Sequence, residues 1–524
     1  MKRYFIPFVA LFASLAFSLS PVSAAEPVRG GTLVIGVPEN PDRLDGHTMR
    51  SFSTSWVTTG TLYNGLVTAD ANSNIIPDLA QSWEIKEKGK VWDFKLRQGV
   101  TFHDGSEFNA EVVKWNFERA LDPKSVYADK KDIVAMVERI EVVDKYTIRF
   151  HLKNATQNFH SAPLAGGTGG RSLPMVSKVA VEKLGPKEFD NHPVGTGPFK
   201  VVEWVRDSHV TMVRNENYFK KGLPYFDRIQ VRILADPTTR FSALRAGEVH
   251  IMYDCPPEMV PTIQKAQGVT YVRSKPCSFV WLVMNCHPEA DKVGCGFFRD
   301  PRVRQAISLA IDRQELVNLV MPGMGEPATG GPLPFGNRYY HQVEGVRYDP
   351  ERAKQLLKEA GYSNLKFTLS TNNSKARFAR ALEVMKEQLS RIGVSTEVEV
   401  LDKAGSTHRM YAKPPQFHAF VEDYEYAIDP SSYLARYLAS GVYQNYGNWS
   451  SPAFDKLLEE GLVEGDFQKR KKIYDQAQEI LVKEGPMLYL WYGVEDMAYS
   501  SKLKGYIFAP YFSSLTFEKA YLEK

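Results

Sequence analysis

The stretch that decides the fold comprises residues 79–113, which read LAQSWEIKEKGKVWDFKLRQGVTFHDGSEFNAEVV. Apolar and polar side chains alternate on both sides of Lys88-Gly89, so this part predicts a β-hairpin that turns there. Asp104-Gly105 predicts a second turn, and Asn109 is a typical N-cap for a helix that begins directly after it. The stretch therefore predicts a unit of sheet and helix, and its residue types require no catalytic role.

Further strand signals flank this hairpin. Residues 146–152 alternate in the same way, so residues 65–185 are expected to form one sheet-and-helix module. The apolar run at residues 32–37, bounded by glycine and proline, predicts the buried opening strand of an α/β domain. Another hairpin is predicted at residues 199–214. The first half of the chain thus combines an α/β domain with a separate module.

The second half of the chain has its own helix and strand signals. Asp300-Pro301 and Asp349-Pro350 each place a capping acid before a proline at the first helical position. Residues 365–401 predict a strand, a helix and a strand, which is the pattern of a βαβ unit in a parallel sheet. A second lobe is therefore expected between about residues 285 and 485. The tail after the strand at residues 487–491 is expected to return to the first lobe.

The N-terminal residues 1–24 predict a secretory signal peptide. Lys2 and Arg3 precede an apolar run at residues 5–19, which is too short to span a bilayer, and small residues close the segment. No cysteine lies in or beside this segment, so attachment of a lipid at the cleavage site is not expected. We therefore expect an exported, unlipidated protein.

Composition and motifs argue against nucleic-acid binding and catalysis. The whole chain has 65 basic and 61 acidic side chains, and removal of Lys2 and Arg3 brings the charges closer to balance. The glycine-rich residues 166–171 lack the Gly-Lys-Ser/Thr ending of a phosphate-binding loop, and His103 has no second histidine at ligand spacing. No serine-nucleophile or zinc-helix motif is present. We expect neither an enzyme nor a cofactor, a metal site or a nucleic-acid partner.

The four cysteines lie close together in the sequence, at Cys255, Cys277, Cys286 and Cys295. Their spacing lacks the Cys-x-x-Cys pairs that are typical of structural zinc sites, and the predicted export places them in an oxidising compartment. Two disulfides are therefore predicted, Cys255–Cys277 between two adjacent strands and Cys286–Cys295 across a polar loop.

Residues 79–113 closely resemble the signature of family 5 extracellular solute-binding proteins, the peptide, nickel and opine class that serves ABC importers. Five more segments match the pattern of this family in the same order along the chain. They are residues 193–199, 215–218, 240–249, 300–307 and 348–354. Ordered matches along nearly the whole chain are far more specific than any single motif.

The resemblance implies an α/β, two-lobed periplasmic-binding-protein fold of type II, from the large cluster with an extra subdomain on the first lobe. The expected boundaries are a signal peptide at 1–24, a discontinuous lobe 1 at 25–64, 186–282 and 491–524, the extra subdomain at 65–185, and lobe 2 at 283–490. It also implies a periplasmic monomer that encloses a small organic solute between hinged lobes and delivers it to an ABC transporter permease in the inner membrane. A secreted hydrolase is the alternative from another functional class.

Members of this family line the ligand site from the ends of strands in both lobes, so polar and aromatic residues at such ends are the candidates. The expected ligand-binding residues are Arg50, Ser53, Trp56, Trp281, Asn285, Tyr424, Tyr426, Asp429, Tyr446, Trp449, Trp491 and Tyr492. Packing in the core explains each aromatic residue at least as well when it is considered alone. The cluster as a whole is therefore better evidence for a ligand site than any one of its members.

The expected ligand class depends on one position near an acid-proline pair of the second lobe. In the peptide-binding relatives, a carboxylate three residues before that acid pairs with the ammonium group of the ligand. In this chain the pair is Asp429-Pro430, which puts the neutral phenol of Tyr426 at that position. We therefore favour a non-peptide organic ligand slightly over a peptide. A shift of one residue would bring in Glu425, and Asp423 is close, so a di- or oligopeptide receptor stays the alternative.

Overall fold

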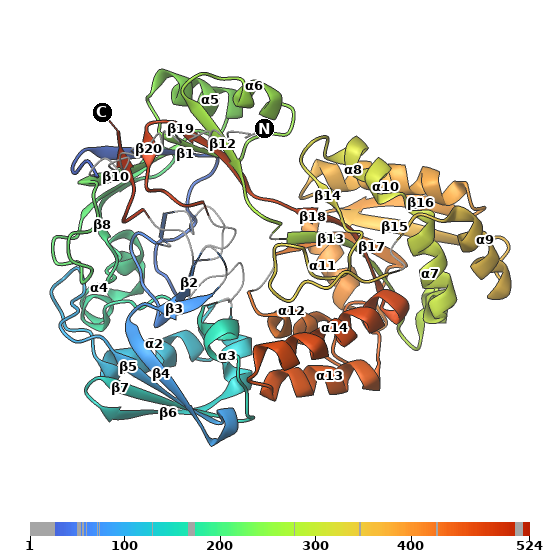
Figure 1. Cartoon of the computed structure of the whole chain (residues 1–524), viewed down its shortest axis with the longest axis horizontal. Helices are drawn as coiled ribbons and strands as arrows, with labels where there is room; N and C mark the ends of the chain where they lie inside the picture. Colours follow the sequence, from blue (N-terminus) through green and yellow to red (C-terminus); the bar gives the residue numbers. More distant parts are fainter. Residues whose placement is uncertain are drawn as a thin grey trace, which may run out of the picture.

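The computed structural model shows two lobes side by side, joined by short chain segments that run from one to the other (Figure 1). The described residues are 27–49, 54, 57, 58, 60–70, 72, 74–127, 129–165, 173–276, 278–344, 347–425, 428–508 and 517–523. The predicted signal peptide and the glycine-rich residues 166–171 lie outside them. The described residues form two large sheets, one four-stranded sheet and two short ribbons.

Lobe 1 is built on a seven-stranded sheet with the strand order β12-β19-β11-β1-β10-β9-β8. Its strands are β1 (Thr32–Val37), β8 (Phe199–Val205), β9 (His209–Arg214), β10 (Arg228–Ile233), β11 (Ile251–Tyr253), β12 (Val269–Arg273) and β19 (Asp496–Ser500). β1 lies between β10 and β11 and is parallel to both, which confirms the buried opening strand. β8 and β9 form the predicted hairpin. Helices α4 (Lys178–Asn191), α5 (Pro237–Ala246) and α6 (Val260–Gln264) and the ribbon of β20 (Leu503–Lys504) and β21 (Tyr521–Leu522) complete this lobe.

A four-stranded antiparallel sheet forms a subdomain at the lower end of lobe 1 in Figure 1. Its elements are β4 (Ala80–Lys86), β5 (Val91–Leu96), β6 (Val137–Asp144), β7 (Thr147–Leu152), α2 (Ala110–Leu121), α3 (Lys130–Met136) and the π-helical turn η2 (His160–Leu164), with the ribbon β2 (Val67–Ala69) and β3 (Ile75–Pro77) above them. The β4–β5 hairpin turns at Glu87–Gly89, as predicted. Asn109 caps α2, because its side chain accepts a hydrogen bond from the Val112 amide at 3.1 Å.

Lobe 2 is built on a six-stranded sheet with the order β14-β18-β13-β17-β15-β16. Its strands are β13 (Ser278–Met284), β14 (Glu326–Pro327), β15 (Lys366–Asn372), β16 (Ser395–Leu401), β17 (Ala419–Glu425) and β18 (Met487–Gly493). Its longer helices are α7 (Pro301–Ala310), α8 (Arg313–Val320), α9 (Pro350–Glu359), α10 (Ala376–Ser390), α11 (Lys403–Tyr411), α12 (Pro430–Leu438), α13 (Pro452–Val463) and α14 (Phe467–Glu484). β15 and β16 are parallel with α10 between them in sequence, so the predicted βαβ unit is confirmed.

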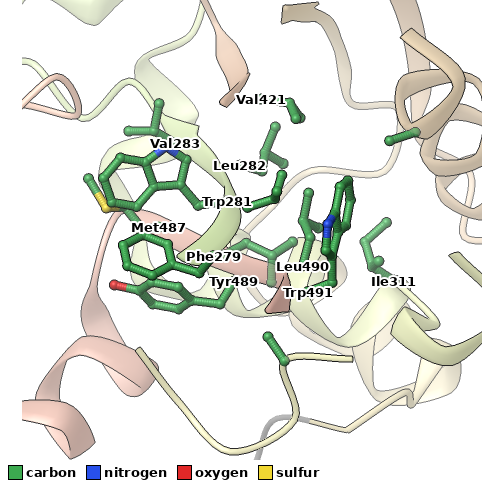
Figure 2. Close-up of a cluster of buried hydrophobic side chains, with 14 of the residues drawn as sticks. Phe279, Trp281, Leu282, Val283, Ile311, Val421, Met487, Tyr489, Leu490 and Trp491 are labelled. Carbon is green, nitrogen blue, oxygen red and sulfur yellow. The ribbon is translucent and has the colours of Figure 1, made fainter. Parts of the chain in front are cut away.

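The acid-proline starts of α7 and α9 are also confirmed. Asp300 accepts a hydrogen bond from the Arg302 amide at 2.8 Å, and Asp349 accepts one from the Arg352 amide at 3.0 Å. The centre of the lobe is apolar and aromatic, with Phe279, Trp281 and Tyr489 packed together on β13 and β18 (Figure 2).

The chain passes between the two large sheets after β12 and after β18, and the described residues of these two crossings, 274–276 and 494–495, lie side by side. The Ser274 amide donates to the Glu495 carbonyl at 2.8 Å, and the Glu495 amide donates to Ser274 Oγ at 3.0 Å. Each crossing is only a few residues long, so the crossings form a compact connection. The lobe boundaries expected from the sequence remain a proposal.

The predicted disulfides are wrong, since Cys255, Cys286 and Cys295 are free, buried thiols and Cys277 lies outside the described residues. Residues 287–299 do not form an open polar loop but fold into two short 3-10 helices, η3 (Ala290–Val293) and η4 (Gly296–Arg299). This folding directs the two thiols to different acceptors: Cys286 Sγ donates to the Phe298 carbonyl at 3.2 Å, and Cys295 Sγ donates to the Ala290 carbonyl at 3.7 Å. Burial raises the pKa of Cys286 to about 11 and that of Cys295 to about 12.

Candidate functional site between the lobes

The structure describes the lobe 2 side of the predicted site. Arg50, Ser53, Trp56 and Tyr426 lie outside the described residues. The predicted contribution of lobe 1 and the role of the position three residues before Asp429 therefore stay predictions. The remaining eight predicted residues belong to lobe 2, and the structure divides them into three groups.

The first group forms a row of aromatic rings that leads from the core of lobe 2 to its surface. Trp281 on β13 stacks on Tyr424 of β17 with ring centroids 6.0 Å apart, and Tyr424 contacts Tyr437 of α12 at 4.2 Å. Tyr437 packs against Tyr446 at 6.1 Å. Trp281 is buried, whereas Tyr424 and Tyr446 are half-buried. The structure thus brings together three of the predicted residues, Trp281, Tyr424 and Tyr446. Together with Tyr437 they form four rings that we call the aromatic row.

Two further tyrosine rings extend the aromatic row toward the other lobe. The hydroxyl groups of Tyr446 and Tyr411 are 2.9 Å apart, and Tyr411 stacks on Tyr443 with ring centroids 4.5 Å apart. Tyr443 is 62% exposed and carries Lys131 of the subdomain over its ring at 5.1 Å, so the series of rings ends at the contact with the other lobe. Sequence analysis missed Tyr437. Its spacing of four from Tyr433 on an amphipathic helix is a signal that would have placed both on one face.

A carboxylate lies on the same face of the sheet as the aromatic row. Glu422 on β17 pairs directly with Trp281 on β13, and its half-buried side chain is within 3.5 Å of the Asn372 amide nitrogen. Burial, followed by the charge of Asp423, raises the pKa of Glu422 to about 7. Asp423 itself is bound by Lys375 and lies 3.7 Å from Arg377. Glu422, which the sequence analysis did not single out, is therefore the less neutralised of these two neighbouring acids.

The second group contains Asp429 alone, and this carboxylate is already paired. Arg470 of α14 donates to both of its oxygens at 2.7 and 2.9 Å, and the Ser431 amide donates to it at 3.0 Å as the cap of α12. Burial by itself would raise the pKa of Asp429, but the charge of Arg470 and its hydrogen bonds hold that pKa well below its usual range. Asp429 is therefore a permanently charged member of a buried ion pair, and a ligand ammonium would have to compete with Arg470.

The third group lies in the interior of lobe 2 with partners of its own. Asn285 donates to the carbonyls of Pro415 and Phe417 at 3.1 and 2.9 Å, and Tyr492 donates to the Gly331 carbonyl at 2.7 Å. Trp449 and Trp491 are also buried. These partners give Asn285 and Tyr492 a structural role, and a ligand-binding role for any of the four residues stays a prediction.

The described residues contain no group of three or more His, Cys, Asp or Glu side chains that could hold a metal ion. None of the helices in the described parts of the chain is both long and apolar enough to cross a membrane. The described side of the candidate site presents aromatic rings and the Glu422 carboxylate, which suits the non-covalent capture of a solute.

Residues 74–445 match the family model for bacterial extracellular solute-binding proteins, family 5. The chain belongs to this family. Glutathione-binding protein GsiB of Pectobacterium atrosepticum is 29% identical over 96% of this chain and 95% of its own length. Among solved structures, DppA of Helicobacter pylori in complex with the peptide STSA is 27% identical, with a TM-score of 0.75 over 95% of this chain and 99% of that one. AgaA of A. tumefaciens R10 in complex with agropinic acid is 26% identical, with a TM-score of 0.76 over 94% of this chain and 99% of that one.

Membership of the family confirms two predictions from the sequence. The α/β fold is that of the two-lobed type II periplasmic binding proteins, and the chain is the solute-binding component of an ABC importer. Of the relatives named above, GsiB binds glutathione, AgaA is in complex with agropinic acid, and DppA, an ABC transporter-associated periplasmic binding protein, is in complex with a peptide. The comparisons do not favour a non-peptide ligand over a peptide, since glutathione and STSA are peptides and agropinic acid is not.

Proposed function

We propose that this family 5 member captures a short peptide or a peptide-like metabolite of the size of glutathione in the periplasm. The observation that carries the proposal is the match to glutathione-binding proteins at 28–29% identity over 94–98% of the chain. Several solved relatives also hold peptides. This proposal replaces the slight preference for a non-peptide ligand, which rested on Tyr426 alone.

The aromatic row and Glu422 support this ligand class. Half-buried tyrosine rings offer apolar faces and hydroxyl groups to a small backbone-rich molecule, and Glu422 offers a carboxylate beside them. A non-peptide organic ligand is the second candidate. It is favoured by the stacking surfaces of the same rings and by the similarity to a protein that binds agropinic acid.

Calorimetry against a matched panel tests the ligand class. The panel contains glutathione, di- to pentapeptides, their N-acetylated forms and agropinic acid. We expect micromolar or tighter binding of glutathione or a short peptide, with release of the unaltered compound. Binding of agropinic acid with no measurable binding of any peptide would establish the second candidate, and turnover of a bound peptide would instead favour a hydrolase.

Export to the periplasm is part of the proposal. It is supported by the predicted signal peptide at residues 1–24 and by membership of a family whose named relatives include periplasmic binding proteins. Intact-mass measurement of the protein from the periplasmic fraction of its host should give the mass of a chain that begins at Ala25, without a lipid. A mass that retains residues 1–24 would contradict this.

A further inference from the structure

A second contact between the lobes lies at the end of the molecule opposite the two crossings (Figure 1). Residues 156–161 of the subdomain meet the start of α12 and the last turn of α13 in lobe 2. The Gln157 amide donates to the Leu462 carbonyl at 2.8 Å, and Thr156 Oγ1 donates to the same carbonyl at 3.3 Å. Closer to the aromatic row, Arg436 of α12 lies 3.1 Å from Asp132 of α3. The lobes are thus bonded on both sides of the region that separates them.

This contact includes the buried ion pair of lobe 2. The side chains of Asp429 and Arg470 are 3% and 8% exposed. Asn158 of the subdomain donates to Asp429 at 3.3 Å and to Ser431, and Ser161 donates to Asp429 at 3.1 Å. A buried charge is stable only when hydrogen bonds replace the water that it has lost. Part of the hydrogen bonding of Asp429 is therefore supplied by the opposite lobe.

The subdomain holds these donors in a fixed position. The Thr156 amide donates to the Gly89 carbonyl at 3.1 Å, and Trp92 Nε1 donates to the Thr156 carbonyl at 3.2 Å. His160 packs against Trp83 and Trp92 with ring centroids 5.3 and 5.1 Å apart. Because the segment is anchored to the β4–β5 hairpin, Asn158 and Ser161 lose little conformational freedom when they meet lobe 2.

We infer that Asn158 and Ser161, together with Asp429 and Arg470, form a latch that closes when the lobes close and so contributes to ligand affinity. When the lobes separate, water replaces Asn158 and Ser161 at Asp429 while Arg470 stays bound, so neither lobe has to unfold. A ligand that binds only the closed form then has an apparent affinity that depends on the closed fraction. These four are positioning residues for ligand capture, which rests on the proposed function.

Two kinds of variant test the latch. The double variant N158A/S161A removes the side-chain bonds from the subdomain to the ion pair and leaves the pair itself intact. The series Gly465→Ala, Gly465→Leu and Gly465→Trp adds bulk at an exposed position, where a Cβ atom would lie 3.3 Å from Gln157 Oε1 of the other lobe. The control is Ser177→Ala, which removes the cap of α4 inside lobe 1.

The decisive measurement is small-angle scattering of the ligand-free proteins. We expect a larger radius of gyration for N158A/S161A and for Gly465→Trp than for the wild type, with a graded effect along the glycine series. Titration with glutathione should then show affinity about tenfold weaker. The control should lose thermal stability without a change of radius. If N158A/S161A and Gly465→Trp keep the wild-type radius and only lose stability, the contact is permanent packing and the latch is refuted. If the wild type does not bind glutathione, the proposed ligand class is refuted but the latch is not. The scattering measurement uses ligand-free protein and does not depend on the ligand.

Discussion

At the scale of single residues, two buried carboxyl groups show how their partners decide their charge. Asp429 is matched by the guanidinium of Arg470, which holds its pKa well below the usual range despite burial. Asp496, at the start of β19, receives hydrogen bonds from the Tyr271 hydroxyl at 2.8 Å and the Cys255 amide at 3.3 Å. Burial outweighs these bonds and raises the pKa of Asp496 to about 6. The two groups therefore need different tests: removal of the partner for Asp429, and removal of the ionisable group itself for Asp496.

The variant Arg470→Met tests the buried ion pair. It leaves Asp429 charged, buried and without its counter-charge, so the free energy of unfolding should fall by about 3–5 kcal/mol. Chemical denaturation followed by fluorescence measures the loss. Arg391→Met is the matched control, because Arg391 pairs with Glu315 and Glu387 at distances of 3.1 and 2.9 Å on the surface of the same lobe. It should cost about 1 kcal/mol or less. Equal losses in the two variants would show that the buried pair stabilises the protein no more than the surface pairs of Arg391 do.

The variant Asp496→Asn tests the raised pKa. Because the folded protein holds this proton more tightly than the unfolded chain, the stability gained by protonation is present below about pH 4. It is lost as the pH rises through about 6. Asparagine cannot ionise, so the stability of the variant relative to the wild type should increase by about 2–3 kcal/mol between pH 4 and pH 7. Thermal unfolding at both pH values measures the difference. If the stability difference between the variant and the wild type is the same at pH 4 and pH 7, the pKa of Asp496 is not raised in the folded protein.

At the scale of secondary structure, the sequence predicted those features whose causes are local. The β4–β5 hairpin, the Asn109 cap and the acid-proline starts of α7 and α9 each depend on a few neighbouring residues, and all were found. The role of Asp429 could not be predicted, because its partners Arg470 and Asn158 are 41 and 271 residues away in sequence. The disulfide predictions were wrong for a related reason. The short helices η3 and η4 bury each thiol against its own carbonyl acceptor.

The turn of the β4–β5 hairpin provides a test at this scale. Gly89 has a φ of 101°, and a Cβ atom there would lie 2.5 Å from the Thr156 carbonyl oxygen. Gly89→Ala should therefore lower the free energy of unfolding by more than about 2 kcal/mol, since it adds a clash to backbone strain. Gly105→Ala is the control, because its φ is also positive, at 84°, but no atom lies within 4 Å of its Cβ position. It should cost about 1 kcal/mol. Urea denaturation compares the two, and similar losses would rule out the close approach of Thr156.

At the scale of the whole molecule, the two crossings and the latch lie at opposite ends of the contact between the lobes. The crossings are short and bonded to each other through Ser274 and Glu495, which favours rotation about that point over sliding. A modest rotation there would separate Asn158 from Asp429 while leaving the core of each lobe intact. The aromatic row lies in lobe 2 between these ends, so rotation would change its exposure without breaking its internal contacts.

Ligand binding should therefore shift this rotation toward the closed form. A solute that contacts both lobes binds the closed form more tightly and raises its population by the ratio of the two affinities. Small-angle scattering should show the radius of gyration decreasing as glutathione, or whichever panel compound binds, approaches saturation. The same compound should raise the melting temperature with its concentration, because at 100 times Kd it adds about 2.7 kcal/mol to the free energy of unfolding. The N-acetylated or otherwise non-binding member of the panel serves as control and should change neither quantity. Stabilisation by ligand with no change of radius would mean that the ligand binds within one lobe, and closure would then not be the way in which this protein captures its solute.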